Sequence, residues 1–217
     1  MNAVSPLPFA EERASPTHFL KVDEGIDVAP LLAQLEAHPD LWDAISYRRT
    51  GHGTPHAQMT DIWVRYDDLA PHIKSGDFEL MRKPFTPIWY PAWKVLTELR
   101  PIVFDLMRKV QGEMLGGIFI TKIPAGGKIA RHVDTGWHPS YFHQFYLSVK
   151  SAPGAEFVCE HEGVRESINP KVGEVWRFKN TKLHWVNNDS ASERITVIIA
   201  IRTELFDCRV EQEDAAA

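Results

Sequence analysis

A histidine and an aspartate two residues apart, His132 and Asp134, are the residues of this sequence best suited to metal chemistry. If both lie in an extended strand, their side chains project from the same face and reach one point. A second imidazole from a distant strand, for which His184 is the candidate, would complete three ligands on one side of a metal ion. Two histidines and one carboxylate with open positions opposite are the ligand set of non-haem Fe(II) oxygenases. The sequence therefore predicts an iron site.

The His-x-Asp spacing alone is weak evidence, because ten histidines give it several chances to occur. A single histidine in a strand is more often a hydrogen-bonded structural residue. The context favours a metal site: the pair follows the turn at 124–127, and His184 lies between a predicted strand and a polar turn. Both places correspond to the rim of a β-sandwich. Ligand histidines must be neutral, and an ordinary imidazole pKa of about 6.5 allows this at neutral pH.

Arg194 is the fourth residue of interest, because it opens the apolar segment 195–201. A dicarboxylate that chelates a metal at one end needs a cation at its other end. Arginine suits this role, since its planar guanidinium pairs with a carboxylate through two parallel hydrogen bonds. A solvated residue at the start of a strand is an equally good interpretation of Arg194.

Composition limits the possible partners. With 217 residues and 44% hydrophobic residues, the chain can bury one substantial core, and we expect a single domain over 1–217. A net charge of −5 predicts no nucleic-acid or membrane-surface partner. The two cysteines and the absence of a signal-peptide pattern favour a cytoplasmic protein. Oligomeric state is not predicted.

We expect the first half of the chain, residues 1–114, to form a helical or mixed buttress, which begins with an irregular arm at 1–17. Apolar spacing predicts a helix at 28–36, and short strands are expected at 19–22 and 59–66. The longest helical pattern spans 93–114, with Pro101 inside it, which predicts two helices or a kink there.

The second half changes to short strands separated by turn residues, a pattern typical of an antiparallel sandwich or barrel. We therefore expect a mainly β fold with flanking helices, with a core over 115–205 and a tail over 206–217. The predicted strands are 117–123, 128–134, 142–149, 156–161, 173–178 and 195–203.

Together these residues resemble the aspartyl/asparaginyl β-hydroxylase family of Fe(II)- and 2-oxoglutarate-dependent oxygenases, which includes bacterial hydroxylases of free L-proline. The matching segments are Ile123-Pro124-Ala125-Gly126-Gly127, His132-x-Asp134, Gly173-Glu174-Val175-Trp176-Arg177-Phe178, His184 and Arg194-Ile195-Thr196. The resemblance covers roughly residues 115–203. Its most specific part is the His-x-Asp pair followed by the distant His and then the Arg.

The resemblance implies a double-stranded β-helix, a cupin-like jelly roll, behind a helical N-terminal half. It implies that His132, Asp134 and His184 bind Fe(II) and that Arg194 binds the distal carboxylate of 2-oxoglutarate. Thr121 matches a position where the family places a hydroxyl beside that carboxylate. Lys122 competes for this role but points to the opposite face of the strand.

One part of the sequence departs from the family. Many members carry Arg-x-His-Leu on the strand after the first ligand, where this chain has Gln144-Phe145-Tyr146-Leu147. Gln144 and Tyr146 share a face and would offer neutral hydrogen bonds to the co-substrate instead. His143 is the alternative if the register differs by one residue.

The implied reaction hydroxylates an unactivated C–H bond of an amino acid or amino-acid side chain, consumes O2 and 2-oxoglutarate, and yields succinate and CO2. The substrate is a small molecule or a peptide. Candidate substrate contacts are His56, Trp63, Arg65 and Arg202, and candidate inert walls are Trp137, Trp176 and Trp185. Two alternatives stay open: a cupin-fold metalloenzyme that does not use 2-oxoglutarate, and a non-catalytic metal-binding jelly roll.

Overall fold

The computed structural model describes residues 18–51 and 53–203. The predicted arm at 1–17 and tail at 206–217 lie outside the described residues, as do the last two residues of the predicted core.

The strands form two antiparallel sheets. The seven-stranded sheet has the order β1-β9-β6-β11-β4-β2-β3, and the four-stranded sheet has the order β5-β10-β7-β8. This arrangement confirms the mainly β fold expected from the sequence. The strands are β1 (Phe19–Asp23), β2 (Thr60–Tyr66), β3 (Ile88–Trp89), β4 (Met114–Ile123), β5 (Lys128–His132), β6 (His143–Lys150), β7 (Ala155–His161), β8 (Val164–Ile168), β9 (Val175–Phe178), β10 (Leu183–Asn188) and β11 (Arg194–Arg202).

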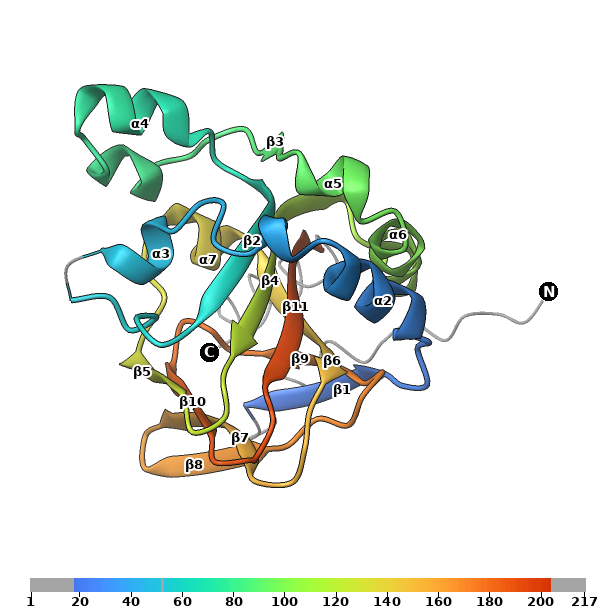
Figure 1. Cartoon of the computed structure of the whole chain (residues 1–217). Coiled ribbons are helices and arrows are strands. Elements are labelled where there is room, and N and C mark those ends of the chain that lie inside the picture. Colours follow the sequence, from blue (N-terminus) through green and yellow to red (C-terminus); the bar gives the residue numbers. More distant parts are fainter. Residues whose placement is uncertain (1–17, 52, 204–217) are drawn as a thin grey trace.

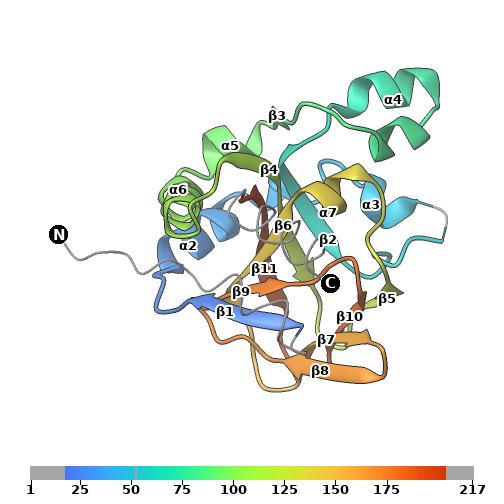
Figure 2. The same cartoon turned by 180° about the vertical axis from the view of Figure 1, so that it is seen from behind.

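The two longer helices, at 29–37 and 99–109, pack along one side of the large sheet, and the small sheet lies on its other side (Figures 1 and 2). None of the helices within the described ranges combines the length and apolar character that crossing a membrane requires. The helical elements are α2 (Ala29–Ala37), η1 (Pro39–Leu41), α3 (Tyr47–Thr50), α4 (Leu69–Ser75), η2 (Glu79–Arg82), α5 (Ala92–Val95), α6 (Leu99–Lys109) and α7 (Trp137–Tyr141).

Alternation along the central strands divides the interior into two clusters. Ile118 and Ile120 of β4 and Val197 of β11 pack with the apolar side chains of α2 and α6. The residues between them, Phe119 and Thr121 among them, face the opposite side and line a cavity beside the small sheet. A second cluster, which includes Tyr146, Phe157 and Phe178, fills the space between the sheets. Because successive side chains point to opposite faces, the large sheet has one packed apolar face and one face that carries polar residues.

Pro101 does not break a helix. The pattern at 93–114 forms two helices, as predicted, but the break lies at residues 96–98 between α5 and α6. Pro101 is the third residue of α6. At that position a backbone N–H has no partner within the helix, so its loss costs little.

The N-terminal half is mixed rather than mainly helical. It contributes β1 and β2 to the large sheet, where β2 pairs with β4 and β1 pairs with β9. The short edge strand β3 pairs with β2 and was not predicted. A buttress that supplies three strands shares hydrogen bonds with the C-terminal half, and we propose that residues 1–217 form the single domain expected from the sequence.

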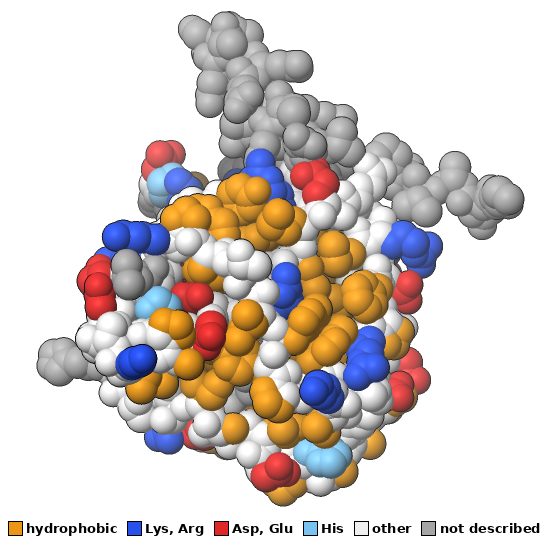
Figure 3. Space-filling model, turned by 90° about the horizontal axis from the view of Figure 1, so that it is seen from above, with side chains coloured by type: hydrophobic (Ala, Val, Ile, Leu, Met, Phe, Trp, Pro, Cys, Tyr) orange, Lys and Arg blue, Asp and Glu red, His pale blue; other side chains and the backbone are white. Residues whose placement is uncertain are grey.

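Hydrophobic side chains form several groups on the face shown in Figure 3, with Lys and Arg between them. Trp89 is 41% exposed and stacks on Trp93, with 4.1 Å between ring centroids. The Arg65 guanidinium lies over the Trp89 ring at 4.8 Å. Such contacts stabilise exposed aromatic rings without a bound partner.

Candidate metal centre

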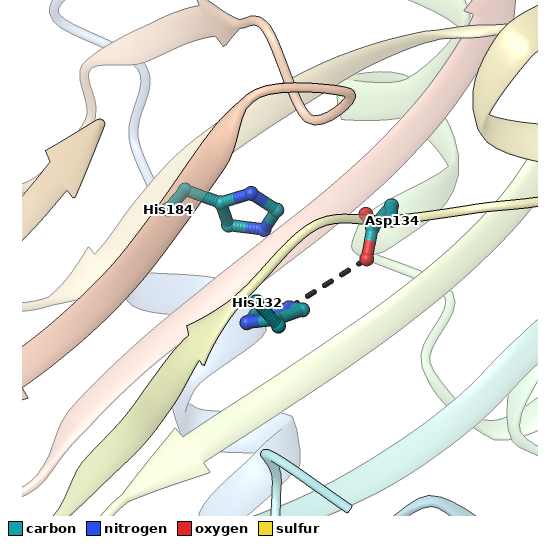
Figure 4. Close-up of side chains that lie close together, drawn as sticks. All are labelled: His132, Asp134 and His184. Carbon is teal, nitrogen blue, oxygen red and sulfur yellow. Dashed lines mark ion pairs between the residues drawn. The ribbon is translucent and has the colours of Figure 1, made fainter. Parts of the chain in front are cut away.

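His132 and His184 face each other across two paired strands. His132 ends β5, and its backbone pairs with that of His184 in β10. Their ring centroids are 4.2 Å apart. Among the described residues, His132, Asp134 and His184 form a group whose potential ligand atoms all lie within 4.8 Å of one another. Figure 4 shows both imidazoles and the carboxylate turned toward a common point.

Backbone carbonyls set the orientation of both imidazoles. His132 Nδ1 lies 2.8 Å from the Ala130 carbonyl oxygen, and His184 Nδ1 lies 2.8 Å from that of Lys182. A carbonyl only accepts, so each Nδ1 donates and each neutral ring keeps its Nε2 lone pair free. Hydrogen bonds of this kind hold metal-ligating histidines in position. The two rings thus present Nε2 toward the cavity.

Asp134 reaches the same point for a reason other than the one predicted. β5 ends at His132, so the two side chains do not share a strand face. Asn180 holds Asp134 instead: the Asp134 N–H donates to the Asn180 carbonyl (3.1 Å), and Asn180 Nδ2 donates to Asp134 Oδ2 (3.2 Å). Asp134 Oδ1 lies 3.6 Å from His132 Nε2 and is the oxygen turned toward the imidazoles.

Burial favours the neutral form of two histidines of this region, His132 and His56. Burial and the neighbouring His184 lower the pKa of His132 below its ordinary value. His56 contacts the His132 ring, with 4.9 Å between centroids, and burial lowers its pKa well below the ordinary range. Neutral imidazoles are the form that binds a metal.

The ligand group opens into a cavity of about 280 Å³ between the two sheets. One wall comes from β4, β6 and β11 of the large sheet, and another from α3, α7 and the segment before β2. Aromatic side chains dominate one part of the wall, where Trp63 and Tyr66 each contact Phe119 edge-on or tilted. A mainly apolar cavity with a few convergent polar groups is the usual form of a small-molecule site.

Arg194 also lines this cavity. Its residue is 2% exposed, and neither Nη1 nor Nη2 has a hydrogen-bond partner among the described residues. The guanidinium carbon lies 5.1 Å from the centre of the Tyr146 ring, and Thr196 Oγ1 donates to Tyr146 Oη at 2.6 Å. Buried Nη groups without an acceptor are costly, so this part of the cavity fits an anion.

The other predicted co-substrate contacts also line the cavity. Thr121 is buried and pairs with Thr196 across β4 and β11. Gln144 and Tyr146 project from β6 into the same space. Lys122 points away, with its Nζ 4.2 Å from the centre of the Trp42 ring. His143 does not line the cavity, and its Nδ1 lies 3.2 Å from Thr203 Oγ1.

The predicted substrate contacts divide into two groups. His56 and Trp63 line the cavity. Arg65 does not, because it donates to the Pro87 carbonyl and lies over Trp89. Arg202 lies over the Tyr141 ring, outside the cavity. None of the proposed inert walls, Trp137, Trp176 and Trp185, lines the cavity.

Sequence reasoning missed three residues of this region: Arg48, His138 and Asn180. Arg48 and His138 line the cavity, and Asn180 holds Asp134. His138 accepts a hydrogen bond from the Gly117 N–H at 3.0 Å, and burial lowers its pKa to about 4. His138 follows Asp134 by four residues in the sequence, and this closeness is the signal that could have found it. Arg48 had no comparable signal.

Several solved structures are similar to this chain in fold. They include an oxidoreductase of the 2OG-Fe(II) oxygenase family from Burkholderia pseudomallei (16% identity, TM-score 0.52, 84% of this chain and 93% of that chain). A Pseudomonas putida prolyl-4-hydroxylase has 14% identity and a TM-score of 0.54 over 91% of this chain and 99% of its own. A Trichoplax adhaerens prolyl hydroxylase, solved with a hypoxia-inducible-factor peptide fragment, has 11% identity and a TM-score of 0.56. The match covers 90% of this chain and 88% of that chain. At these identities the similarity establishes the fold alone.

The family assignment rests on a family sequence profile described as "Aspartyl/Asparaginyl beta-hydroxylase". This profile matches residues 91–204, more than half of the chain. No curated protein sequence matches the chain. The matched region contains the ligand group and Arg194, and it confirms the resemblance found in the sequence. The chain belongs to the aspartyl/asparaginyl β-hydroxylase family of Fe(II)- and 2-oxoglutarate-dependent oxygenases.

Proposed function

We propose that this protein hydroxylates an unactivated C–H bond of an amino acid or amino-acid side chain, with 2-oxoglutarate as co-substrate and succinate and CO2 as co-products. The proposal rests on family membership and on one arrangement in the cavity. Three ligand atoms of the type that binds Fe(II) face the same cavity as the buried Arg194, whose two Nη atoms have no hydrogen-bond partner among the described residues.

Two sets of cavity residues fit the metal ion and the co-substrate. His132 Nε2, His184 Nε2 and one oxygen of Asp134 would hold Fe(II), because these atoms converge and their other polar atoms are already hydrogen-bonded. Arg194 would bind the distal carboxylate of 2-oxoglutarate through its two unpaired Nη atoms. Thr121 and Tyr146 line the same part of the cavity.

Gln144 and Tyr146 are our candidates for neutral contacts with the co-substrate. Gln144 is buried, lines the cavity and has no positive charge to offer a carboxylate. Many members have Arg-x-His at these positions. Without that arginine, the metal ion would neutralise the charge of the iron-proximal carboxylate. The amide of Gln144 then orients the co-substrate rather than neutralising it.

When bound, iron and 2-oxoglutarate supply the oxidation that converts a C–H bond into an alcohol. The protein holds the ligand atoms in place and limits the access of water to the co-substrate. Arg194 is buried, and Trp63, Tyr66 and Phe119 form an aromatic wall, so these parts of the cavity would exclude water around a bound co-substrate. The fixed imidazoles and the Asn180–Asp134 pair hold the ligand atoms before any substrate binds.

The similar structures support the substrate class. Two of them are prolyl hydroxylases by description, and one was solved with a peptide fragment. We therefore propose an amino-acid or peptide substrate for this chain, acted on with 2-oxoglutarate and O2.

The test is the conversion of 2-oxoglutarate to succinate by the purified protein. Succinate should form in aerobic buffer with Fe(II), stop when the metal is chelated, and fall to background in His184→Ala. Metal-independent succinate formation, or equal formation by His184→Ala, would contradict the proposal. The Lys122→Ala variant is the matched control, since Lys122 lies outside the cavity.

A further inference from the structure

Arg48 is a second arginine of the cavity, in addition to Arg194; the two come from different elements, α3 and β11. It belongs to the short helix α3 and lines the cavity wall. Its Nη1 donates to Asp61 Oδ2 at 3.1 Å, and its Nη2 lies 3.3 Å from His56 Nε2. The guanidinium carbon lies 4.6 Å from the centre of the Phe119 ring. Arg48 is therefore fixed by three neighbours.

These contacts leave most of the guanidinium available. A guanidinium carries five N–H donors, and the described residues accept two of them, so three remain. The side chain is 20% exposed and the residue lines the cavity. Because arginine can only donate, His56 Nε2 must be the acceptor of the second bond. Three donors of a residue that lines the cavity thus have no acceptor among the described residues.

Two strands fix the position of Arg48 relative to the ligand group. Its partner Asp61 is 1% exposed and pairs with Thr121, which in turn pairs with Thr196. Its other partner, His56, contacts the His132 ring. Arg48 therefore approaches the metal ligands from the side of His132 and β2, whereas Arg194 lies beside Tyr146 of β6.

The charges of the cavity assign the two arginines to different molecules. On the function proposed above, on which this inference rests, the carboxylates of 2-oxoglutarate belong to the metal and to Arg194. Neither carboxylate needs Arg48. Asp61 offsets the positive charge of Arg48 while the cavity is empty of substrate, and the unused donors still favour an incoming anion.

We propose that Arg48 binds a carboxylate of the substrate and so selects substrates that carry a free carboxylate group. Trp63, Tyr66 and Phe119 line the cavity beside it and contact the apolar part of the substrate. Residues in the interior of a peptide have no backbone carboxylate. The side chains of Asp and Glu are the carboxylates that an interior residue can offer, and we assign Arg48 to an α-carboxylate, so that the substrate is a free amino acid or the carboxyl-terminal residue of a peptide.

The experiment measures binding without turnover. The protein is loaded with Zn(II), a redox-inert metal, and with 2-oxoglutarate, and the free L-amino acids are titrated by calorimetry. Each amino acid that binds is then compared with its carboxamide, its N-acetyl derivative and its N-acetyl carboxamide. We expect the carboxamide to bind about tenfold or more weakly, because a charge-assisted hydrogen bond is lost. The N-acetyl acid separates the two sources: it binds if the substrate is a peptide end and fails if it is a free amino acid.

Arg48→Gln should abolish the preference for the acid over its carboxamide, whereas Arg48→Lys should retain part of it. Arg49→Gln is the matched control, because Arg49 is the next residue, pairs with Asp43 and does not line this cavity. Affinity for 2-oxoglutarate, measured in the same samples, should change little in all three variants and reports that the site is intact.

Several outcomes would overturn the inference. They are equal binding of acids and carboxamides, tight binding of the N-acetyl carboxamides, no binding of any free acid or N-acetyl acid at millimolar concentration, or a preference that survives Arg48→Gln. A fall in 2-oxoglutarate affinity equal to that for the amino acid would assign Arg48 to the co-substrate instead. Failure of the wild-type protein to bind 2-oxoglutarate at all would count against the proposed function, and the two failures are thus distinguishable.

Discussion

His132 and His184 form a cross-strand pair between β5 and β10, and each donates its Nδ1–H to a backbone carbonyl two residues earlier in its own strand segment. The two rings are therefore held by the sheet itself. Because neither tautomer depends on a side-chain partner, the pair presents its Nε2 atoms before a metal arrives. This relationship carries the assignment of the metal centre.

Replacing either histidine should abolish metal binding. We expect His132→Ala and His184→Ala each to lose stoichiometric Fe(II), because two remaining ligands cannot hold the ion on one side. The measurement is the metal content of anaerobically loaded protein after gel filtration. His143→Ala is the control, since His143 lies outside the cavity, and it should retain one iron per chain. Retention of iron by either ligand variant would refute the assignment.

Arg194→Ala should separate the co-substrate from the metal. The two unpaired Nη atoms make no contribution to metal binding, so Fe(II) affinity should stay near that of wild type. Affinity for 2-oxoglutarate should fall by roughly a hundredfold, the value of about two charge-assisted hydrogen bonds. Calorimetry with 2-oxoglutarate and a separate metal titration test this. An equal loss of both affinities would show that Arg194 is structural.

Asn180→Ala should weaken the metal site without emptying it. Asn180 is buried and makes two hydrogen bonds to Asp134, one through its side chain. Loss of the side-chain bond frees Asp134 to rotate, and we expect Fe(II) affinity to fall by about ten- to a hundredfold. Asn169→Ala removes an exposed asparagine elsewhere and should have no effect. Unchanged affinity in Asn180→Ala would mean that the backbone bond alone positions Asp134.

His138 should make the protein less stable in acid. Its pKa is about 4 in the folded protein, because burial disfavours the charged ring and Nε2 accepts from the Gly117 N–H. The unfolded chain takes up this proton near its ordinary pKa of about 6.5, so stability falls as pH drops below that value. The contribution reaches about 2 to 3 kcal/mol by pH 4.5.

The His138→Gln variant should lose that share of the pH dependence. Urea unfolding of both proteins at pH 7.5 and pH 4.5 gives two differences in unfolding free energy, and the difference for the variant should be smaller. Comparing the pH-induced change, rather than absolute stability, removes any cost of the substitution itself. An identical change in both proteins would show that the folded protein protonates His138 normally.

Local patterns in the sequence predicted most of the C-terminal strands, because β4, β6, β7, β9 and β11 are short apolar segments between turn residues. The period of two also placed Thr121 and Lys122 on opposite faces, and the structure has them so. The break near Pro101 was misplaced, because a proline in the first turn of a helix is compatible with that helix.

The residues that sequence reasoning missed are held by contacts distant in sequence. Asn180 meets Asp134 across 46 residues of chain, and Arg48 meets its cavity neighbour Phe119 from a separate helix. No spacing rule connects such residues, because the folded sheet alone brings them together. Arg65 and Arg202 show the converse: both have the right chemistry for a substrate carboxylate, yet each is held at an aromatic ring outside the cavity.

The most direct test of the metal centre is an anaerobic titration of the Fe(II)-loaded protein with 2-oxoglutarate, followed by visible absorption. Chelation of the iron by 2-oxoglutarate should produce a weak charge-transfer band that saturates at one co-substrate per chain in the wild-type protein. The band should be absent in His184→Ala and should require a much higher concentration of 2-oxoglutarate in Arg194→Ala. A protein that holds iron but shows no band at any concentration of 2-oxoglutarate would contradict the account.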